Sequence, residues 1–148
     1  MKLLLILLIC ISVYAKSDIY FFPQDANRAS DDIAKLINES KTSIDIAMYN
    51  FKYNKFADLL QKAKDRGVKI KIFYTKKDVD FKDIKAIPVV DRKLHTKIAI
   101  FDKKIVAFGS PNWKKKSFTQ NYEVLYITDD KKLLLEFNKF YKMLESTH

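Results

Sequence analysis

The sequence predicts an α/β protein with a mixed β-sheet flanked by helices on both faces. In the first half of the chain, apolar residues recur alternately at the two-residue period of strands and at the 3.6-residue period of helices. In the second half, two apolar runs lie on either side of a two-residue turn, as in an antiparallel hairpin. The length of 148 residues suits one such domain and is too short for two.

The first half of the domain is expected to contain three strands and two helices. Alternating or short apolar runs predict the strands at residues 19–22, 43–49 and 68–72. The first helix is expected to begin at Ser30, whose hydroxyl can cap it, and to bury Ile33 and Ile37. The second helix is expected to present the apolar residues of 56–63 on one face and to end at Gly67.

The second half is expected to contain three strands and a final helix. Residues 94–101 and 104–108 predict two strands joined by a tight turn at Asp102-Lys103. Residues 124–127 are apolar throughout, which favours a strand in the centre of the sheet. The polar stretch 76–87 predicts no clear element. The final helix is indicated by an apolar stripe formed by Leu133, Phe137, Phe140, Tyr141 and Leu144.

Residues 1–15 are typical of an export signal, which leaves residues 16–148 as the folded domain. Lys2 supplies the positive start, an apolar run follows, and Ala15 is a small residue of the kind that precedes a cleavage site. We therefore expect a periplasmic or secreted protein. An uncleaved signal that anchors the protein in the inner membrane is the alternative, because more apolar residues follow closely at 19–22.

Cysteine and metal chemistry are not expected in the exported domain. Cys10 is the only cysteine and lies in the predicted signal, so disulfides and thiolate sites are excluded from residues 16–148. No cluster of His, Cys and carboxylate residues has the spacing of metal ligands. We expect no metal and no cofactor.

The charge of the chain points to a polyanionic partner. Lys and Arg number 28 against 18 Asp and Glu, which gives a formal net charge of +10. Such an excess favours nucleic acid or anionic lipid, although a basic surface that only aids solubility is the alternative.

Only two histidines are candidates for acid–base or nucleophilic chemistry. His148 is the last residue, where chains tend to fray. His95 falls in a predicted strand, and the alternation of a strand would point it the same way as Lys97. An imidazole beside an ammonium suits an anion site, whereas the alternative is a buried histidine next to a lysine that reaches solvent.

A second candidate group follows the predicted hairpin. Gly109 lies at a turn, where a glycine lets backbone amides approach a ligand, and Ser110 and Asn112 supply neutral donors. A helix is expected just after them, with its N-terminus favouring an anion. The carboxylate of Glu123 can hold an imidazole in one tautomer. The alternative is an ordinary turn with a helix cap.

The pattern of these residues resembles the motif of the phospholipase D superfamily. The chain looks closest to the small secreted Nuc-type bacterial endonucleases, which carry one such motif per chain, and this implies a phospholipase D-like α-β-α sandwich. Pro111 departs from the Ala or Phe that is commoner there. The matching positions are His95-x-Lys97-x4-Asp102, Gly109-Ser110-x-Asn112-Trp113 and Asn121-x-Glu123.

The resemblance implies a metal-independent phosphodiesterase with a phosphohistidine intermediate. His95 would attack phosphorus, while Lys97, Ser110 and Asn112 hold the phosphoryl oxygens. Glu123 would orient the His95 ring. A catalytic and a structural role for the remaining motif residue, Asp102, are both open, because it lies at the hairpin turn.

The single motif implies a homodimer with a shared active site, because the leaving oxygen needs an acid that a second His95 can supply. The expected substrate is DNA, with RNA an alternative, held near Gly109 by Lys114 and Lys115. Trp113 and Tyr49 are candidates to stack on bases, although such aromatics are more often core. The competing functions are a phospholipase D that acts on phospholipids and a non-catalytic exported DNA-binding protein.

Overall fold

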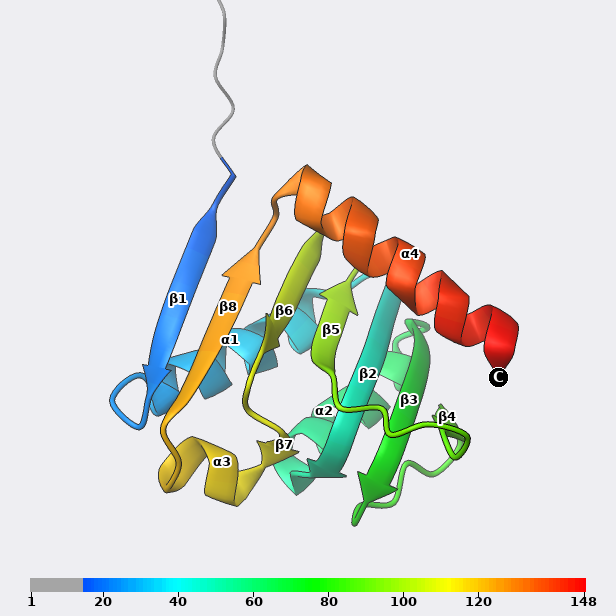
Figure 1. The fold of residues 1–148 in the computed structure, drawn as a ribbon, viewed down its shortest axis with the longest axis horizontal. Coiled ribbons are helices and arrows are strands. Elements are labelled where there is room, and N and C mark those ends of the chain that lie inside the picture. Colours follow the sequence, from blue (N-terminus) through cyan, green and yellow to red (C-terminus); the bar gives the residue numbers. More distant parts are fainter. Residues whose placement is uncertain (1–14) are drawn as a thin grey trace, which may run out of the picture.

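The computed structural model describes residues 15–148, so the predicted signal lies almost entirely outside the described residues. One mixed sheet runs through the domain in the order β1-β8-β6-β5-β2-β3-β4, with short β7 paired to β2 (Figure 1). The strands are β1 (Ser17–Phe22), β2 (Ser43–Lys52), β3 (Lys69–Lys77), β4 (Lys85–Pro88), β5 (Lys97–Phe101), β6 (Ile105–Gly109), β7 (Trp113–Lys114) and β8 (Glu123–Thr128). The helices are α1 (Ala26–Glu39), α2 (Asn54–Asp65), α3 (Lys115–Thr119) and α4 (Lys131–Thr147).

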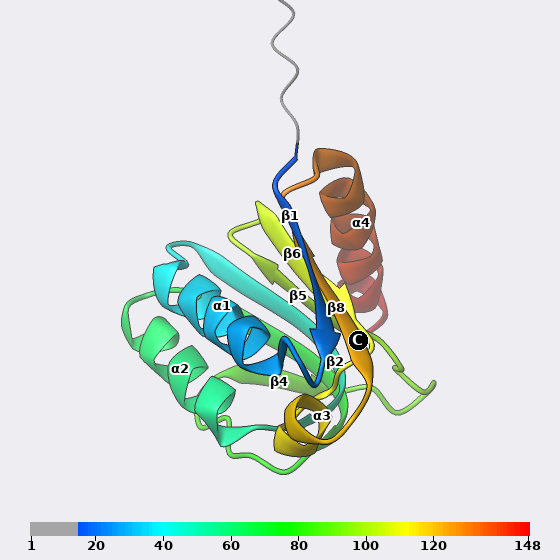
Figure 2. The same ribbon diagram turned by 90° about the vertical axis from the view of Figure 1, so that its left-hand side faces the viewer.

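The predicted fold class is confirmed. β2, β3 and β4 run parallel, whereas β5, β6, β8 and β1 pair antiparallel in turn. Helices α1 and α2 cover one face of the sheet and α4 crosses the other (Figures 1 and 2). Because α4 lies over β6, β5, β2 and β3, the α4-side face of β1 and β8 is left without a helix (Figure 1).

Two apolar clusters hold the layers together. The larger packs α1 and α2 against the sheet and includes Ile33, Ile46 and Leu60, none of which has any exposed surface. The smaller packs α4 through Leu134 and Tyr141 against the opposite face. Burying large aliphatic and aromatic side chains on both faces is what stabilises such a three-layer domain.

Most turn signals in the sequence are confirmed. Gly67 ends the α2 segment with φ of +94°, a conformation that residues with a side chain rarely adopt. Asp102 and Lys103 form the tight turn between β5 and β6 with φ values of 52° and 57°. This turn matches the twist of the hairpin strands that it joins.

The predicted start of the first helix is wrong. Helix α1 begins at Ala26, and Ser30 lies inside it with its hydroxyl accepting a hydrogen bond from Lys55 Nζ at 2.9 Å. Ala26 and Ala29 are buried in the core, so the apolar face starts one turn earlier than the larger aliphatic residues indicate. Small alanines contribute little to a hydrophobic periodicity, which is why the pattern misses this turn.

Three further expectations are corrected at the strands. β8 is an interior strand, paired with β1 and β6, but it lies next to the edge strand β1 and not at the middle of the sheet. β5 begins at Lys97, so His95 lies just before the strand and its direction is not set by alternation. The stretch without a clear element contains β4, a four-residue edge strand at Lys85–Pro88 that is too short to show a period.

The helix expected after Asn112, whose N-terminus was expected to favour an anion, is α3, which has only five residues.

Two further observations bear on partners. Within the described residues, none of the helices combines the length and the apolar character needed to traverse a bilayer.

The α4-side face of β1 and β8 exposes Ile19 and Phe21, with relative exposures of 49% and 55%. Exposed apolar side chains that lie together often mark a contact surface.

Candidate active site

The sheet brings the predicted site residues together at one edge. β5 begins at Lys97, β6 ends at Gly109 and β8 begins at Glu123, and β6 lies between the other two. β2 reaches the same edge, since Met48 pairs with Lys97. Antiparallel pairing therefore places at one edge residues that lie far apart along the chain.

His95 and Lys97 form the centre of this edge. The Lys97 ammonium nitrogen lies 3.4 Å from each ring nitrogen of His95 and donates a hydrogen bond to the His95 carbonyl oxygen at 2.9 Å. The imidazole is exposed, and this rules out a histidine sealed in apolar packing. On its other side, the ring lies 4.8 Å, centre to centre, from the ring of Tyr49.

The surroundings of His95 favour its neutral form. The positive charge of Lys97, then desolvation and the charge of Lys93, lower the pKa of His95 below its ordinary value of 6.5. A neutral imidazole keeps a nitrogen lone pair, which a nucleophile requires. Desolvation also lowers the pKa of Lys97, while the charge of Glu123 opposes that shift.

Asn112 is held with its carbonyl oxygen turned toward β2. Asn112 Oδ1 accepts a hydrogen bond of 3.1 Å from the backbone N–H of Asn50. The backbone N–H of the preceding residue, Tyr49, donates to the Thr96 carbonyl at 2.9 Å, next to His95. These bonds fix the Asn112 amide near the histidine and leave its NH2 group as the donor for a ligand.

Ser110 is anchored to β8. Its backbone N–H donates to the Val124 carbonyl at 2.9 Å, and its hydroxyl oxygen accepts from the Val124 N–H at 3.0 Å. The hydroxyl hydrogen is still free to bind an anion.

The role predicted for Gly109 is corrected. A Cβ at this position would lie 2.1 Å from the carbonyl oxygen of Val124. The glycine is therefore required by close strand packing against β8, and not by the approach of a ligand to its backbone.

Glu123 does not contact the His95 ring, contrary to the expected orienting role. Its Oε1 accepts a hydrogen bond of 2.9 Å from the amide of Asn121. Its charge acts instead on Lys97, where it opposes the lowering of the pKa by desolvation. The carboxylate is thus held by Asn121 at the same edge of the sheet.

Asp102 is structural. Its carboxylate accepts hydrogen bonds of 2.8–3.1 Å from the backbone N–H groups of Lys41, Thr42 and Ser43, and a further bond from the Thr42 hydroxyl. It lies at the far end of β5 from His95, roughly 20 Å away at the rise of an extended strand. Asp102 therefore locks the hairpin turn to the loop between α1 and β2.

Trp113 is part of the core and cannot stack on bases. Only 2% of its surface is exposed, and its ring packs edge-on against Phe51 and Phe56. The neighbouring Lys114 and Lys115 lie at the start of α3, at the same edge as the site. Their predicted binding of substrate stays a prediction.

A cavity of about 400 Å³ opens beside His95, between the segment before β5 and the end of α4. His148 lines it and is not frayed: its side chain is only 14% exposed, and its Nε2 lies 3.4 Å from Asp91. No sequence pattern indicates this position of His148, because it depends on how α4 docks against the sheet. The cavity walls include Val89, Arg92, Lys93, Phe140 and Leu144.

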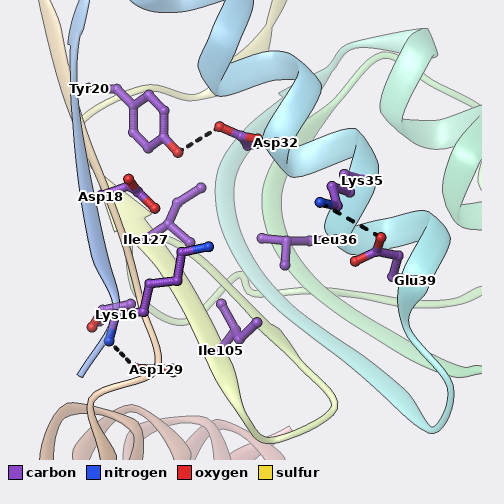
Figure 3. A pocket seen from close by; sticks show the side chains of 11 residues that line it. Lys16, Asp18, Tyr20, Asp32, Lys35, Leu36, Glu39, Ile105, Ile127 and Asp129 are labelled. Carbon is purple, nitrogen blue, oxygen red and sulfur yellow. Dashed lines mark hydrogen bonds and ion pairs between the residues drawn. The ribbon is translucent and has the colours of Figure 1, made fainter. Parts of the chain in front are cut away.

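A second hollow, of about 190 Å³, lies away from the motif between α1 and the β1–β8–β6 part of the sheet (Figure 3). Its polar groups are mostly paired with one another: the Tyr20 hydroxyl donates to Asp32 at 2.8 Å, and Lys35 lies 4.0 Å from Glu39. Burial, followed by the hydrogen bond to Asp32, raises the pKa of Tyr20 well above its usual range. This hollow contains none of the motif residues.

Sequence reasoning missed one residue at this edge and misjudged another. Lys76 of β3 places its ammonium nitrogen 5.6 Å from the centre of the Tyr49 ring, in a stretch that showed no pattern. Tyr49 contacts His95 and three lysines rather than presenting a free face for a base.

Among residues 15–148, no three His, Cys, Asp or Glu side chains are grouped as metal ligands.

Comparisons with known proteins give one family. Residues 33–144 match the family described as the PLD-like domain of cardiolipin synthase. No curated protein sequence is a significant match.

Several solved structures are similar over nearly the whole chain. NucT from Helicobacter pylori is 28% identical, with a TM-score of 0.78 over 90% of this chain and 98% of NucT. Nuc from Salmonella typhimurium, described as a phospholipase D family member, is 23% identical, with a TM-score of 0.73 over 87% of this chain and 93% of that one. The archaeal chromatin protein TrmBL2 shares the fold at 19% identity and a TM-score of 0.61, over 95% of this chain and 55% of that one.

Proposed function

This chain belongs to the phospholipase D-like family and is a phosphodiesterase, and from that premise we propose that it hydrolyses nucleic acid through a covalent bond to His95. The observation that carries the proposal is the exposed His95 ring with Lys97 Nζ 3.4 Å from both of its nitrogens. A neutral nucleophile beside a cation matches what a phosphodiester, an anionic and weak electrophile, requires.

The reaction has two balanced steps. A ring nitrogen of His95 attacks phosphorus, the bond from phosphorus to the leaving oxygen breaks, and that oxygen takes a proton from an acid. Water then attacks the phosphohistidine and loses a proton to the same group, now a base, while the His95 nitrogen leaves. Lys97, Ser110 and Asn112 hold the other phosphoryl oxygens as negative charge builds on them.

The acid comes from a second copy of the chain in this proposal. His148 lines the cavity beside His95 but lies at the end of α4, outside the motif, whereas a two-fold dimer would bring a second motif imidazole to the site, so His95 of a partner is the proposed acid. The uncovered face of β1 and β8 supports a dimer, because Phe21 and Val124 are exposed there and pair across the strands. A cavity of about 460 Å³ links this patch to Ser110 and Glu123 of the site.

Nucleic acid is the proposed substrate because of charge. The net charge of +10 and the lysines near His95 favour a polymer with one negative charge per nucleotide. DNA is the first candidate, and RNA is tested beside it. Export to the periplasm or the medium is proposed from residues 1–15, with anchoring in the inner membrane as the other arrangement.

One set of digestions tests the activity. Plasmid DNA, RNA and phosphatidylcholine vesicles are incubated with wild type and His95→Ala, with and without EDTA. We expect nucleic acid to be cut by the wild type alone, with or without EDTA. Cleavage of the vesicles but not of nucleic acid would establish a phospholipase. DNA binding without turnover would establish a binding protein, and loss of activity in EDTA with recovery in magnesium would contradict the metal-independent scheme.

A mixing experiment tests the shared site. Equal amounts of wild type and His95→Ala, unfolded and refolded together, should retain about one quarter of the wild-type activity per total protein, because only pure wild-type dimers carry both imidazoles. Independent sites would retain one half. His148→Ala is the matched control. A loss in this variant as large as that in His95→Ala would make His148 the acid instead.

A further inference from the structure

Three lysines from three different segments surround one aromatic ring beside His95. Lys76 comes from β3, Lys93 from the segment before β5, and Lys97 from β5 itself. Their ammonium nitrogens lie 5.6, 5.2 and 5.7 Å from the centre of the Tyr49 ring, respectively. The ring holds them through its negative faces, as in other cation–π contacts.

Two of these lysines have no counter-charge. Within residues 15–148, no carboxylate lies in ion-pair range of Lys76 or Lys93. Other lysines of the same sheet are paired: Lys52 of β2 with Asp78, and Lys71 of β3 with Glu145. The ammonium groups near this ring repel one another, because, in addition to desolvation, the charge of Lys93 lowers the pKa of Lys97. An anion bound between them would remove that repulsion.

We propose that Lys76 and Lys93, held by Tyr49, bind the phosphate next to the one that His95 attacks. The inference rests on the proposed function, and it divides the cations of the site between two phosphates. Lys97, in contact with His95, serves the phosphate that reacts. Lys76 and Lys93 reach the ring of Tyr49 without contacting His95, so they serve a neighbour along the same strand.

This subsite selects a polymer over a single phosphodiester. A dinucleotide with one phosphate offers nothing for Lys76 and Lys93, whereas each internal phosphate of a longer strand has a neighbour. Contacts to phosphate carry no base information, so the gain applies to every sequence and falls as salt rises. Tyr49 acts here as a positioning residue for the lysines.

The test compares a substrate that has no neighbouring phosphate with a longer one that has several. The full chain is assayed over a range of pH and each variant is compared at its own optimum, because the charge of Lys93 also influences the pKa of His95. The substrates are thymidylyl-thymidine and a ten-residue oligothymidylate, and kcat/KM is measured per phosphodiester. In Lys76→Gln/Lys93→Gln, the preference for the longer strand should fall by about tenfold or more. The slope of log kcat/KM against log salt on the longer strand should flatten by about one to two.

The control removes the same charge elsewhere. Lys69 lies at the opposite end of β3 and Lys132 at the start of α4, both exposed, and Lys69→Gln/Lys132→Gln should keep the wild-type preference within about twofold. An unchanged preference in Lys76→Gln/Lys93→Gln, or an equal loss in the control, would overturn the subsite while leaving the nuclease intact. Cleavage of neither substrate by the wild type would overturn the nuclease itself.

Discussion

The two ends of β5 carry residues of one motif but have opposite character. At the start, His95 is exposed, its ring nitrogens have only a long contact to Lys97, and Lys76 and Lys93 nearby lack carboxylates within ion-pair range. At the end, the carboxylate of Asp102 is satisfied by four donors from the loop between α1 and β2. An unsatisfied polar edge is available for a ligand, whereas a satisfied one serves the fold.

A residue can therefore belong to the motif without having a catalytic role. His95 and Asp102 are separated by seven residues of extended chain, so they cannot act on one phosphate within a subunit. The distance in sequence between His95 and Asp102 is nevertheless constrained, because β5 must extend from the candidate site to the hairpin turn at Asp102. Variants at each end should therefore separate activity from stability.

The largest effect is expected for His95→Ala. Removing the nucleophile should lower kcat on DNA by about 10³-fold or more. The melting temperature should change little, since the side chain is exposed and makes no core contact. Calorimetry measures the melting temperature, and a single-turnover assay on the same preparation measures the rate of cleavage. An unfolded His95→Ala variant would contradict the separation of activity from stability.

Lys97→Ala should have the second largest effect. The lysine contacts His95 and is proposed to stabilise charge on the phosphoryl oxygens, so kcat should fall by about 10²-fold. Its charge is also the first cause of the lowered His95 pKa, so that pKa should rise in the variant. NMR titration of the His95 ring gives the second readout. An unchanged ring pKa would contradict the close contact.

Asp102→Ala should lower the stability of the protein and leave its activity nearly unchanged. The backbone N–H groups of Lys41, Thr42 and Ser43 lose their acceptor, which should cost about 2 kcal/mol of unfolding free energy. The kcat of the folded variant should stay within about threefold of the wild-type value. Urea denaturation and assays at low temperature test this, and a folded but inactive variant would restore a catalytic role to Asp102.

The same carboxylate predicts a pH dependence. Partial burial tends to raise the pKa of Asp102, but hydrogen bonds from the Thr42, Lys41 and Ser43 backbone outweigh it and hold the pKa below 3.8. The stabilisation is therefore fully present above the unfolded pKa of about 3.9 and is lost as pH falls through the lowered folded value. The gap in stability between wild type and Asp102→Ala should close in strong acid.

The smallest effect is expected for Lys93→Gln on thymidylyl-thymidine. Lys93 is one of the charges that lower the His95 pKa, so its removal should raise that pKa. The acid limb of kcat/KM should move to higher pH, because the imidazole must be neutral to attack. A limb that stays in place or moves to lower pH would contradict the assignment of this limb to the His95 ring beside Lys93.

The strand and helix pattern could be predicted from the sequence because it depends on local periods. The alternation of residues 43–49, the hairpin at Asp102-Lys103 and the glycine at Gly67 are all confirmed. The start of α1 was misjudged because buried alanines at its first turn give a weak signal. The edge strand β4 was missed because four residues show no period.

Part of the site could also be predicted, since His95, Lys97, Ser110 and Asn112 have the chemistry and the spacing of a phosphodiesterase motif. The partners of these residues could not. Whether Glu123 accepts a hydrogen bond from His95 or from Asn121 depends on side-chain rotamers, and the spacing of residues in the sequence does not determine these.

The order of residues along the chain determined the class of the fold, the candidate nucleophile His95 and the basic charge, because each of these depends on neighbouring positions or on composition. Only the tertiary structure decided that Trp113 is buried in the core and that Asp102 binds the loop between α1 and β2. It also decided that Lys76 and Lys93 lie close to the ring of Tyr49. The reason is physical: burial and charge convergence depend on which strands become neighbours, and strand pairing joins segments that are far apart in sequence.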